Sequence, residues 1–278
     1  VAGNGFRQVG AFADTATLAL ANTGAMGSFN TGSQHLLFTA SSLDQGITSL
    51  AIDAAGSLSV LHSYDSMKRF GIYQPTQLAT VEVGAADFLV VGAAGSGSLS
   101  VFEILTGGAL VARDATWDSL DTRFQGGTAI ETLEFGGRAF VLAGGRDGGL
   151  TLFELGPDGR LYFLTNLLDT ATTTLASVAA IEAVDVGGEI QVFVASATES
   201  GISQFALDLG VLGNVVVPSG PTDTAVGTPG DDLLFGTVER DTLRGMAGND
   251  RIIDGHGIDM IHGGAGADTF VFVRDGRC

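Results

Sequence analysis

Aspartates recur every nine residues near the C-terminal end of this chain, each followed two positions later by an apolar side chain. The aspartates are Asp232, Asp241, Asp250, Asp259 and Asp268, and the apolar residues are Leu234, Leu243, Ile252, Ile261 and Phe270. Carboxylates gathered by a regular repeat can bind Ca²⁺, because this hard cation takes many oxygen ligands and tolerates irregular geometry. Mg²⁺ requires stricter octahedral geometry and keeps its waters. The spacing therefore makes these aspartates candidate ligands for a hard divalent cation.

Five nonapeptides in one register carry these aspartates. They are GTPGDDLLF (227–235), GTVERDTLR (236–244), GMAGNDRII (245–253), DGHGIDMIH (254–262) and GGAGADTFV (263–271). Their consensus, G-G-x-G-x-D-x-U-x with U a large apolar residue, resembles the RTX, or hemolysin-type, calcium-binding repeat. The resemblance implies Ca²⁺ as cofactor. It also implies a secreted, extracellular protein, exported in one step from a Gram-negative bacterium.

Each nonapeptide predicts a turn followed by a very short strand. Glycine permits positive φ and close backbone approach, so G-G-x-G favours a tight turn with inward carbonyls. The following x-U-x favours a strand with U facing an interior and its neighbours facing out. The resemblance implies a parallel β-roll in which repeats eighteen residues apart stack. The expected metal-site residues are Gly227, Gly230, Asp232, Asp241, Gly245, Gly248, Asp250, Gly255, Gly257, Asp259, Gly264, Gly266 and Asp268.

Stacking predicts up to three calcium sites of unequal quality. Carboxylates at roughly the 4.8 Å spacing of neighbouring strands repel, and a divalent cation removes this repulsion. The sites would bridge repeats one and three, two and four, and three and five. Repeat two has Thr237 and Glu239 at glycine positions, so the site it shares with Asp259 is the weaker one. The stronger side is formed by Asp232, Asp250 and Asp268.

A second repeat, with a period of about 51 residues, runs through the first 225 residues. Each period holds four strand-like runs, of which the second and third are continuously apolar, as in AFVLAGG (139–145) and GLTLFELG (149–156). Four strands per period of this length predict β-propeller blades. The Phe/Gly-rich pattern resembles lactonase-type propellers. Blades are expected near 18–65, 75–118, 127–169 and 178–223, the last with its own outer strand within 213–223.

The predicted fold class is therefore all-β, with a β-propeller over residues 1–223 and a short parallel β-roll over 224–278. The segment Gly5–Asp14 is left over as an outer strand with no blade before it. We interpret the chain as part of a larger propeller; a four-bladed ring closed by that segment is the alternative. The sequence also stops soon after the last repeat, where RTX proteins normally continue, which suggests a truncated roll.

Composition narrows the partners. A net charge of −18 with Lys68 as the single lysine argues against a nucleic-acid partner. The sequence has no run of eighteen apolar residues, so we expect no transmembrane segment. Cys278 is the one cysteine, which leaves no intrachain disulfide. With 42 glycines and five prolines, the chain favours many tight turns.

The propeller region offers few candidates for catalysis. Polar residues occupy equivalent turns between the second and third strands of the blades, where a structural role is the expected one. These residues are Asp44, Ser96, Arg146 with Asp147, and Glu199. The zinc motif H-E-x-x-H, the nucleophile elbow G-x-S-x-G and a phosphate-binding G-K-[ST] loop are all missing from the sequence.

Three functional hypotheses remain. The first is a secreted calcium-binding protein in which calcium folds the roll and the propeller binds or scaffolds an unknown extracellular ligand or polymer. The second is a propeller hydrolase, such as a lactonase, with an RTX secretion tail. The third is a surface adhesin or matrix protein. Acids or a histidine converging on a metal at the channel mouth would favour the enzyme.

Overall fold

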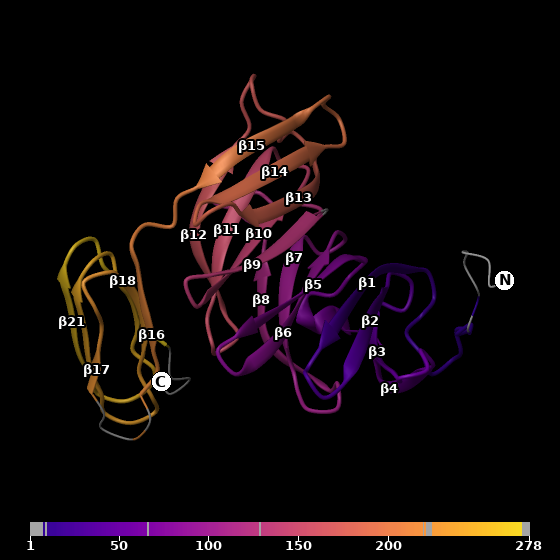
Figure 1. Ribbon diagram of the computed structural model, residues 1–278, viewed down its shortest axis with the longest axis horizontal. Coiled ribbons are helices and arrows are strands. Elements are labelled where there is room, and N and C mark those ends of the chain that lie inside the picture. The colour runs from indigo at the N-terminus through magenta and orange to yellow at the C-terminus, as the bar shows by residue number, and fades with distance from the viewer. Residues whose placement is uncertain are drawn as a thin grey trace. The chain divides into compact units, whose positions relative to one another are not determined.

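The computed structural model describes residues 8, 10–65, 67–127, 129–218, 220 and 224–273. Strands dominate these residues, and the one helix among them is a short 3₁₀ turn, η1 (Met67–Phe70) (Figure 1). The chain divides into two compact units, residues 1–207 and residues 208–278. No helix in the described ranges is long and apolar enough to cross a membrane.

Four antiparallel sheets follow one another in the N-terminal unit, each with its strands in chain order. The first contains β1 (Thr23–Asn30), β2 (His35–Ser41), β3 (Gly46–Ile52) and β4 (Leu58–Tyr64). The second contains β5 (Pro75–Val83), β6 (Ala86–Ala93), β7 (Ser98–Ile104) and β8 (Leu110–Trp117). The third contains β9 (Ala129–Phe135), β10 (Arg138–Gly144), β11 (Gly149–Leu155) and β12 (Leu161–Leu168). The fourth contains β13 (Val178–Asp185), β14 (Ile190–Ser196) and β15 (Ile202–Leu207).

These sheets are arranged as propeller blades. The first strands of consecutive sheets contact one another, β1 with β5, β5 with β9 and β9 with β13, so each blade places its first strand innermost (Figure 1). In the second and third blades the second and third strands are buried almost throughout, which explains their continuous apolar runs, whereas β15 of the fourth blade alternates between exposed and half-buried residues. In the third blade every residue of β10 and β11 is buried. The predicted all-β propeller architecture is confirmed.

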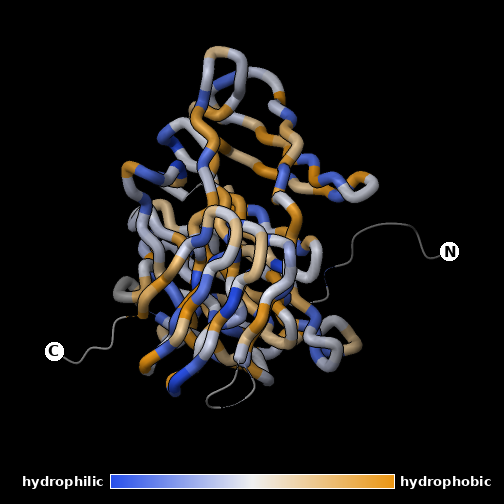
Figure 2. Tube along the Cα trace, turned by 90° about the vertical axis from the view of Figure 1, so that its left-hand side faces the viewer, coloured by the Kyte–Doolittle hydropathy of each residue, from blue (hydrophilic) through white to orange (hydrophobic). Residues whose placement is uncertain are grey.

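The core between the second and third blades shows how this burial arises. Val90 and Val101 from one blade pack in the same cluster as Val141 and Phe153 from the next, and Phe124 from the connecting loop joins them. Phe124 and Phe153 meet edge to face, with ring centroids 5.8 Å apart. Figure 2 shows hydrophobic and hydrophilic residues alternating along many of the strands, as expected for sheets that are covered unequally on their two faces.

The prediction that the fourth blade has its own outer strand within 213–223 is wrong. The segment assigned to it forms β16 (Leu212–Val216), which pairs in parallel with β18 (Asp231–Phe235) of the roll. Val216 lies beside Leu234, eighteen residues later, and joins the apolar cluster of the roll. Burial in that cluster explains why the segment leaves the blade. The fourth sheet accordingly has three described strands, and the C-terminal unit begins ahead of the expected boundary at 224.

Blade limits in the first three sheets agree with the predicted segments. Their strands span 23–64, 75–117 and 129–168. Part of the leftover segment Gly5–Asp14, including Gly5, lies outside the described residues, as does Asp223. Whether the chain is a fragment of a larger propeller or closes with four blades therefore stays a prediction.

The C-terminal unit is a roll of two parallel sheets. One has the order β16, β18, β20 (Arg251–Ile253), β22 (Thr269–Val271), and the other has the order β17 (Thr224–Val226), β19 (Thr242–Ala247), β21 (Met260–Ala265). The pairs are offset by eighteen residues, as in Leu234 with Ile252 and Leu243 with Ile261, except that Leu212 pairs with Asp231 ahead of a register shift in β16. The predicted stacking of odd repeats on odd and even on even is confirmed.

The interior of the roll is nearly as predicted. Leu234, Leu243 and Ile252 are fully buried, and Ile261 packs against them. Phe270 is 43% exposed, because among the described residues no later coil stacks on it. Conversely, Leu233, Phe235 and Ile253 were expected to face out and are buried. In-register pairing sets Phe235 beside Ile253 and Leu233 beside Arg251, so these neighbours help to cover one another.

A buried ion pair joins the two central strands of the third blade. Arg138 on β10 donates from Nε to Oε1 and from Nη2 to Oε2 of Glu154 on β11, both at 2.6 Å. Their side chains are 6% and 1% exposed. The equivalent glutamate of the second blade, Glu103, pairs instead with Arg113 on an outer strand, where the arginine side chain is 42% exposed. The two pairs differ mainly in desolvation.

Glu154→Gln should therefore lower the free energy of unfolding by about 3–5 kcal/mol, because it leaves the Arg138 charge buried without its counter-charge. The matched change Glu103→Gln should cost about 1 kcal/mol or less, since its partner remains solvated. Urea unfolding followed by far-UV circular dichroism measures both. Equal midpoints for the two variants would contradict this account.

Candidate metal centre

The aspartates of the nonapeptides form two ladders inside the roll. Asp232 donates its backbone N–H to Asp250 Oδ1 at 2.9 Å, and Asp250 donates in the same way to Asp268 Oδ1 at 3.1 Å. On the other side, Asp241 donates to Asp259 Oδ1 at 2.8 Å. Asp232, Asp241 and Asp250 are each only 1% exposed. The structure thus brings the predicted carboxylates together in two rows, one on each side of the roll.

Like charges crowd the middle of the longer row. Burial raises the pKa of the Asp250 carboxyl above its ordinary value, and the neighbouring carboxylates of Asp232, Asp268 and Asp231 raise it further. The backbone N–H of Asp232 opposes this by stabilising the anion. Without a cation, the charged form of Asp250 is therefore disfavoured.

The first glycine of a repeat makes space for oxygens from two coils. A Cβ at Gly245 would lie 2.0 Å from Asp250 Oδ2 and 2.5 Å from the carbonyl oxygen of Gly263. Gly227 has the same surroundings one coil earlier, with Asp232 Oδ2 at 2.4 Å and Gly245 O at 2.5 Å. Only glycine fits there, because any side chain would enter the space between carboxylate and carbonyl.

The remaining predicted glycines lie against carbonyl oxygens of the stacked coil. Each would place a Cβ within 2.6 Å of such an oxygen. These contacts join Gly230 to Val211, Gly248 to Gly230, Gly255 to Thr237, Gly257 to Glu239, Gly264 to Met246 and Gly266 to Gly248. Gly236 and Gly263 stand at the first position of the same consensus but were not among the predicted metal-site residues.

These residues fit a calcium ion. Asp250 Oδ2 and Asp241 Oδ1 are buried, and neither has a hydrogen-bond partner. No cluster of three or more His, Cys, Asp or Glu side chains forms within the described ranges. The donors are instead carboxylate oxygens in ladder pairs together with backbone carbonyls, which are the hard ligands that calcium prefers. A bound calcium ion would neutralise the row of carboxylates.

Two threonines are part of the site and were missed as contributors. Thr228 and Thr237, at the second position of repeats one and two, each donate both N–H and Oγ1–H to the aspartate four residues later. The sequence signal was present, since both repeats begin Gly-Thr. Thr237 was predicted only to weaken its turn, and Thr228 was not among the predicted site residues.

The expected weakness of repeat two stays a prediction. Thr237 O accepts a hydrogen bond from His256 N at 2.7 Å, so this carbonyl is already engaged in the stack. Asp241 and Asp259 nevertheless form the same ladder as their odd-numbered counterparts. The hydrogen bonds between stacked coils therefore do not show that the even-numbered side binds calcium more weakly than the odd-numbered side.

Polar turn residues of the propeller form hydrogen bonds with the loops that join blades. Asp44 Oδ2 accepts from Ala21 N at 2.8 Å, Asp147 Oδ1 from Gln125 N at 3.1 Å and Glu199 Oε2 from Ala176 N at 2.9 Å. Ser96 Oγ donates to Gly71 O at 2.5 Å. Arg146, beside Asp147, donates its backbone N–H to Gln125 O at 2.8 Å. A repeated bond to the incoming chain is what a structural role requires.

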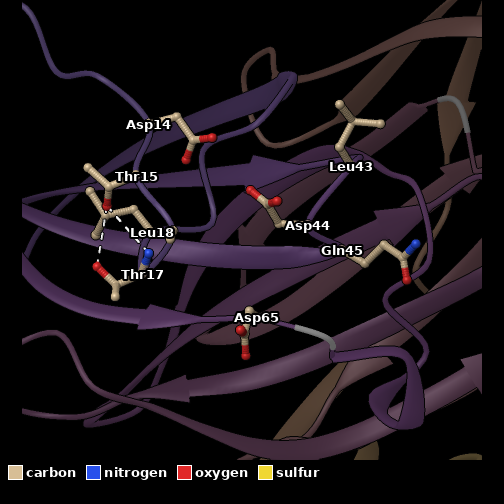
Figure 3. Close-up of a pocket in the computed structure, with 9 residues that line it drawn as sticks. Asp14, Thr15, Thr17, Leu18, Leu43, Asp44, Gln45 and Asp65 are labelled. Carbon is tan, nitrogen blue, oxygen red and sulfur yellow. Dashed lines mark hydrogen bonds between the residues drawn. The ribbon is translucent and has the colours of Figure 1, made fainter.

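One hollow of the propeller unit is lined by three aspartates, Asp14, Asp44 and Asp65 (Figure 3). Its volume is about 490 Å³. Asp44 Oδ2 accepts hydrogen bonds from Ala21 N at 2.8 Å and from Ser41 Oγ at 3.1 Å. Asp14 and Asp65 are exposed. Their equivalents Asp118 and Asp169 each accept two loop hydrogen bonds, which indicates that these positions cap the connection to the next blade.

A glutamate on an inner strand has a displaced pKa. Burial raises the pKa of Glu131 on β9 to about 7, with a further contribution from the charge of Glu182 on β13. A backbone hydrogen bond at Ala183 acts in the opposite direction. The pair shows that acidic side chains of adjacent blades meet at the inner strands.

Fold and site together define an all-β protein with propeller-like blades and a parallel roll suited to calcium. Residues 222–238 and 235–270 match the model of the RTX calcium-binding nonapeptide repeat, in four copies. The C-terminal region therefore carries RTX repeats. No curated protein sequence matches this chain.

Three solved structures are similar in fold. A functionally unknown protein from Desulfotomaculum acetoxidans has 13% identity and a TM-score of 0.49, over 67% of this chain and 52% of that one. A protein from Lactobacillus plantarum has 15% identity and a TM-score of 0.42, over 61% and 53%. An exo-β-1,3-galactanase from Phanerochaete chrysosporium, solved with β-1,3-galactotriose, has 10% identity and a TM-score of 0.46, over 69% and 49%. The chain spans about half the length of each.

Gly245→Ala should weaken calcium binding by about five- to 150-fold, the equivalent of roughly 1–3 kcal/mol of overpacking. The added methyl would overlap Asp250 Oδ2 and Gly263 O. Gly24→Ala is the control, because its nearest neighbour, Pro75 O, would be 3.6 Å away. Isothermal titration with calcium measures the change, and unaltered affinity in Gly245→Ala would rule out this packing.

Glu131 should make the stability of the propeller depend on pH. Between about its ordinary pKa of 4.5 and its folded value of about 7, the folded state holds a proton that the unfolded chain has released. The free energy of unfolding should therefore fall as pH rises through this window and stay level above it. Urea unfolding across pH 5–8 should show this fall reduced in Glu131→Gln and unchanged in the exposed control Glu189→Gln. A fall of equal size in all three proteins would contradict the assignment.

Proposed function

We propose that this chain is a secreted calcium-binding protein in which calcium folds the C-terminal roll, while the propeller serves as a binding or scaffold module. The observation that carries the proposal is the row of carboxylates beside backbone carbonyls, in which Asp250 is buried and its Oδ2 lacks a hydrogen-bond partner. The match of residues 222–270 to RTX calcium-binding repeats supports it independently.

The physical basis is linkage between metal binding and folding. A site assembled from several coils does not exist in the unfolded chain, so the free energy of binding becomes free energy of folding. Extracellular calcium modules have dissociation constants of about 10⁻⁴ to 10⁻³ M. Such sites stay empty at cytosolic calcium levels and fill outside the cell. The roll would then remain unfolded for export and fold on arrival.

The propeller suits a binding or scaffold role because its polar turn residues are engaged in holding the blades. Asp44, Ser96, Asp147 and Glu199 all bond to the loops between blades. Its blade cores are apolar and closely packed, which provides a rigid support for surface loops. The ligand would be an extracellular molecule or polymer that meets these loops.

Removing calcium should unfold part of the roll and leave the blades intact. With chelator, limited proteolysis should cleave within the repeats, 227–271, while residues 20–207 survive, because the blades contain none of the candidate metal ligands. Added calcium should restore protection. Asp250→Asn should need at least about tenfold more calcium, since it removes a charged ligand, whereas the exposed control Asp121→Asn should behave as the wild type. Identical cleavage with and without calcium would disprove the proposal.

A further inference from the structure

The aspartate turns of the roll are of two unlike kinds. In repeat one, Asp232 has both carboxylate oxygens engaged by protein donors. Oδ1 accepts from Asn214 N at 2.5 Å and from Thr228 Oγ1 at 3.0 Å, and Oδ2 accepts from Thr228 N at 2.6 Å. This carboxylate already has the hydrogen bonds that a buried anion requires.

Repeat two repeats the arrangement. Asp241 Oδ2 accepts from Thr237 N at 2.7 Å and from Thr237 Oγ1 at 2.9 Å. Both threonine hydroxyls are tied in further, since Gly230 N and Glu239 N each donate to the hydroxyl two residues earlier, at 3.2 Å. Each threonine therefore closes its own turn and holds one oxygen or both oxygens of its aspartate; in repeat two the other oxygen, Asp241 Oδ1, is buried and has no hydrogen-bond partner.

Repeats three to five lack this device. Their second positions are Met246, Gly255 and Gly264, whose side chains cannot donate a hydrogen bond. Asp250 is buried with Oδ2 unpartnered. Met246 also holds a positive φ of 86°, which a non-glycine residue adopts only under constraint. The turn of repeat three is thus strained and its carboxylate is unsatisfied.

The roll also starts earlier than its recognised repeats. β17 stacks on β19 in the eighteen-residue register, and β16 stacks on β18 in the same register from Val215 onward. Asn214 lies eighteen residues before Asp232, where the later coils have aspartate. Asn214 contributes a backbone donor to Asp232 without adding a negative charge. The coils before repeat one therefore extend the stack without lengthening the row of carboxylates.

We propose that Thr228 and Thr237 are hydroxyl latches that close the first two aspartate turns before calcium binds. Residues 209–244 then fold without metal and form a preformed end of the roll, and calcium is required only for residues 245–271. Calcium at the Asp232 turn would have to displace hydrogen bonds already made, whereas at Asp250 it fills an unmet need. This inference rests on the proposed calcium-dependent folding of the roll and specifies where that dependence begins.

Hydrogen–deuterium exchange of the full chain, with calcium and with chelator, tests the latches. In the wild type with chelator, amides of 227–244 should stay protected while those of 245–271 exchange freely. The double variant T228G/T237G restores the consensus glycine and removes both hydroxyls. Its amides in 227–244 should lose about tenfold or more of their protection in chelator, because hydrogen bonds to a carboxylate are lost, and should regain it with calcium. T228S/T237S keeps the hydroxyls and should match the wild type.

The outcomes separate this inference from the proposed function. If both halves of the wild-type roll exchange freely in chelator and become protected together with calcium, the latches are disproved and calcium-dependent folding stands. If T228G/T237G matches the wild type in chelator, the hydroxyls have no such role. If calcium changes no amide of 227–271, both proposals fail. Blade amides within 23–207 report in each sample whether the variant has folded.

Discussion

Parallel stacking at an interval of eighteen residues is the constraint on which the roll depends. It aligns equivalent side chains of alternate repeats, so the apolar residue of each coil joins one interior, as Leu234 and Ile252 do. The same alignment places Asp250 between Asp232 and Asp268. One periodicity thus creates the apolar core and the electrostatic repulsion together. The core favours the stack, and the row of buried carboxylates opposes it until their charges are compensated.

The roll meets this repulsion in different ways along its length. Backbone N–H groups of one coil donate to the carboxylates of the next stacked coil throughout both ladders. In the first two repeats threonine hydroxyls add donors. In the second and third repeats one carboxylate oxygen, Asp241 Oδ1 and Asp250 Oδ2, stays buried without a partner. Departures from a consensus therefore need not be defects. A residue that weakens one kind of turn can stabilise another.

The propeller is stabilised mainly by burial of apolar side chains between blades, and it has no comparable row of carboxylates among the described residues. Its blades pack face to face, and short polar bonds from Asp44, Asp147 and Glu199 fix the chain as it enters each blade. These residues recur at equivalent turns of different blades, so their position reflects a structural requirement of each blade. The ion pair of Arg138 with Glu154 is an individual feature of the third blade, because the second blade places its arginine on an outer strand.

The sequence by itself determined the two periodicities, and with them the blade strands, the coil register and the aspartates of the candidate site. These follow from local chemistry, since glycine spacing sets turns and the alternation of apolar residues sets strands. Only the tertiary structure decided that Leu212–Val216 joins the roll, because the choice depends on whether Val216 finds a better apolar partner in Leu234 or in a blade. It also decided that Thr228 and Thr237 reach the aspartates, and that Leu233 and Ile253 are buried. Such contacts depend on how side chains meet across coils, which the residue pattern of a single coil does not contain.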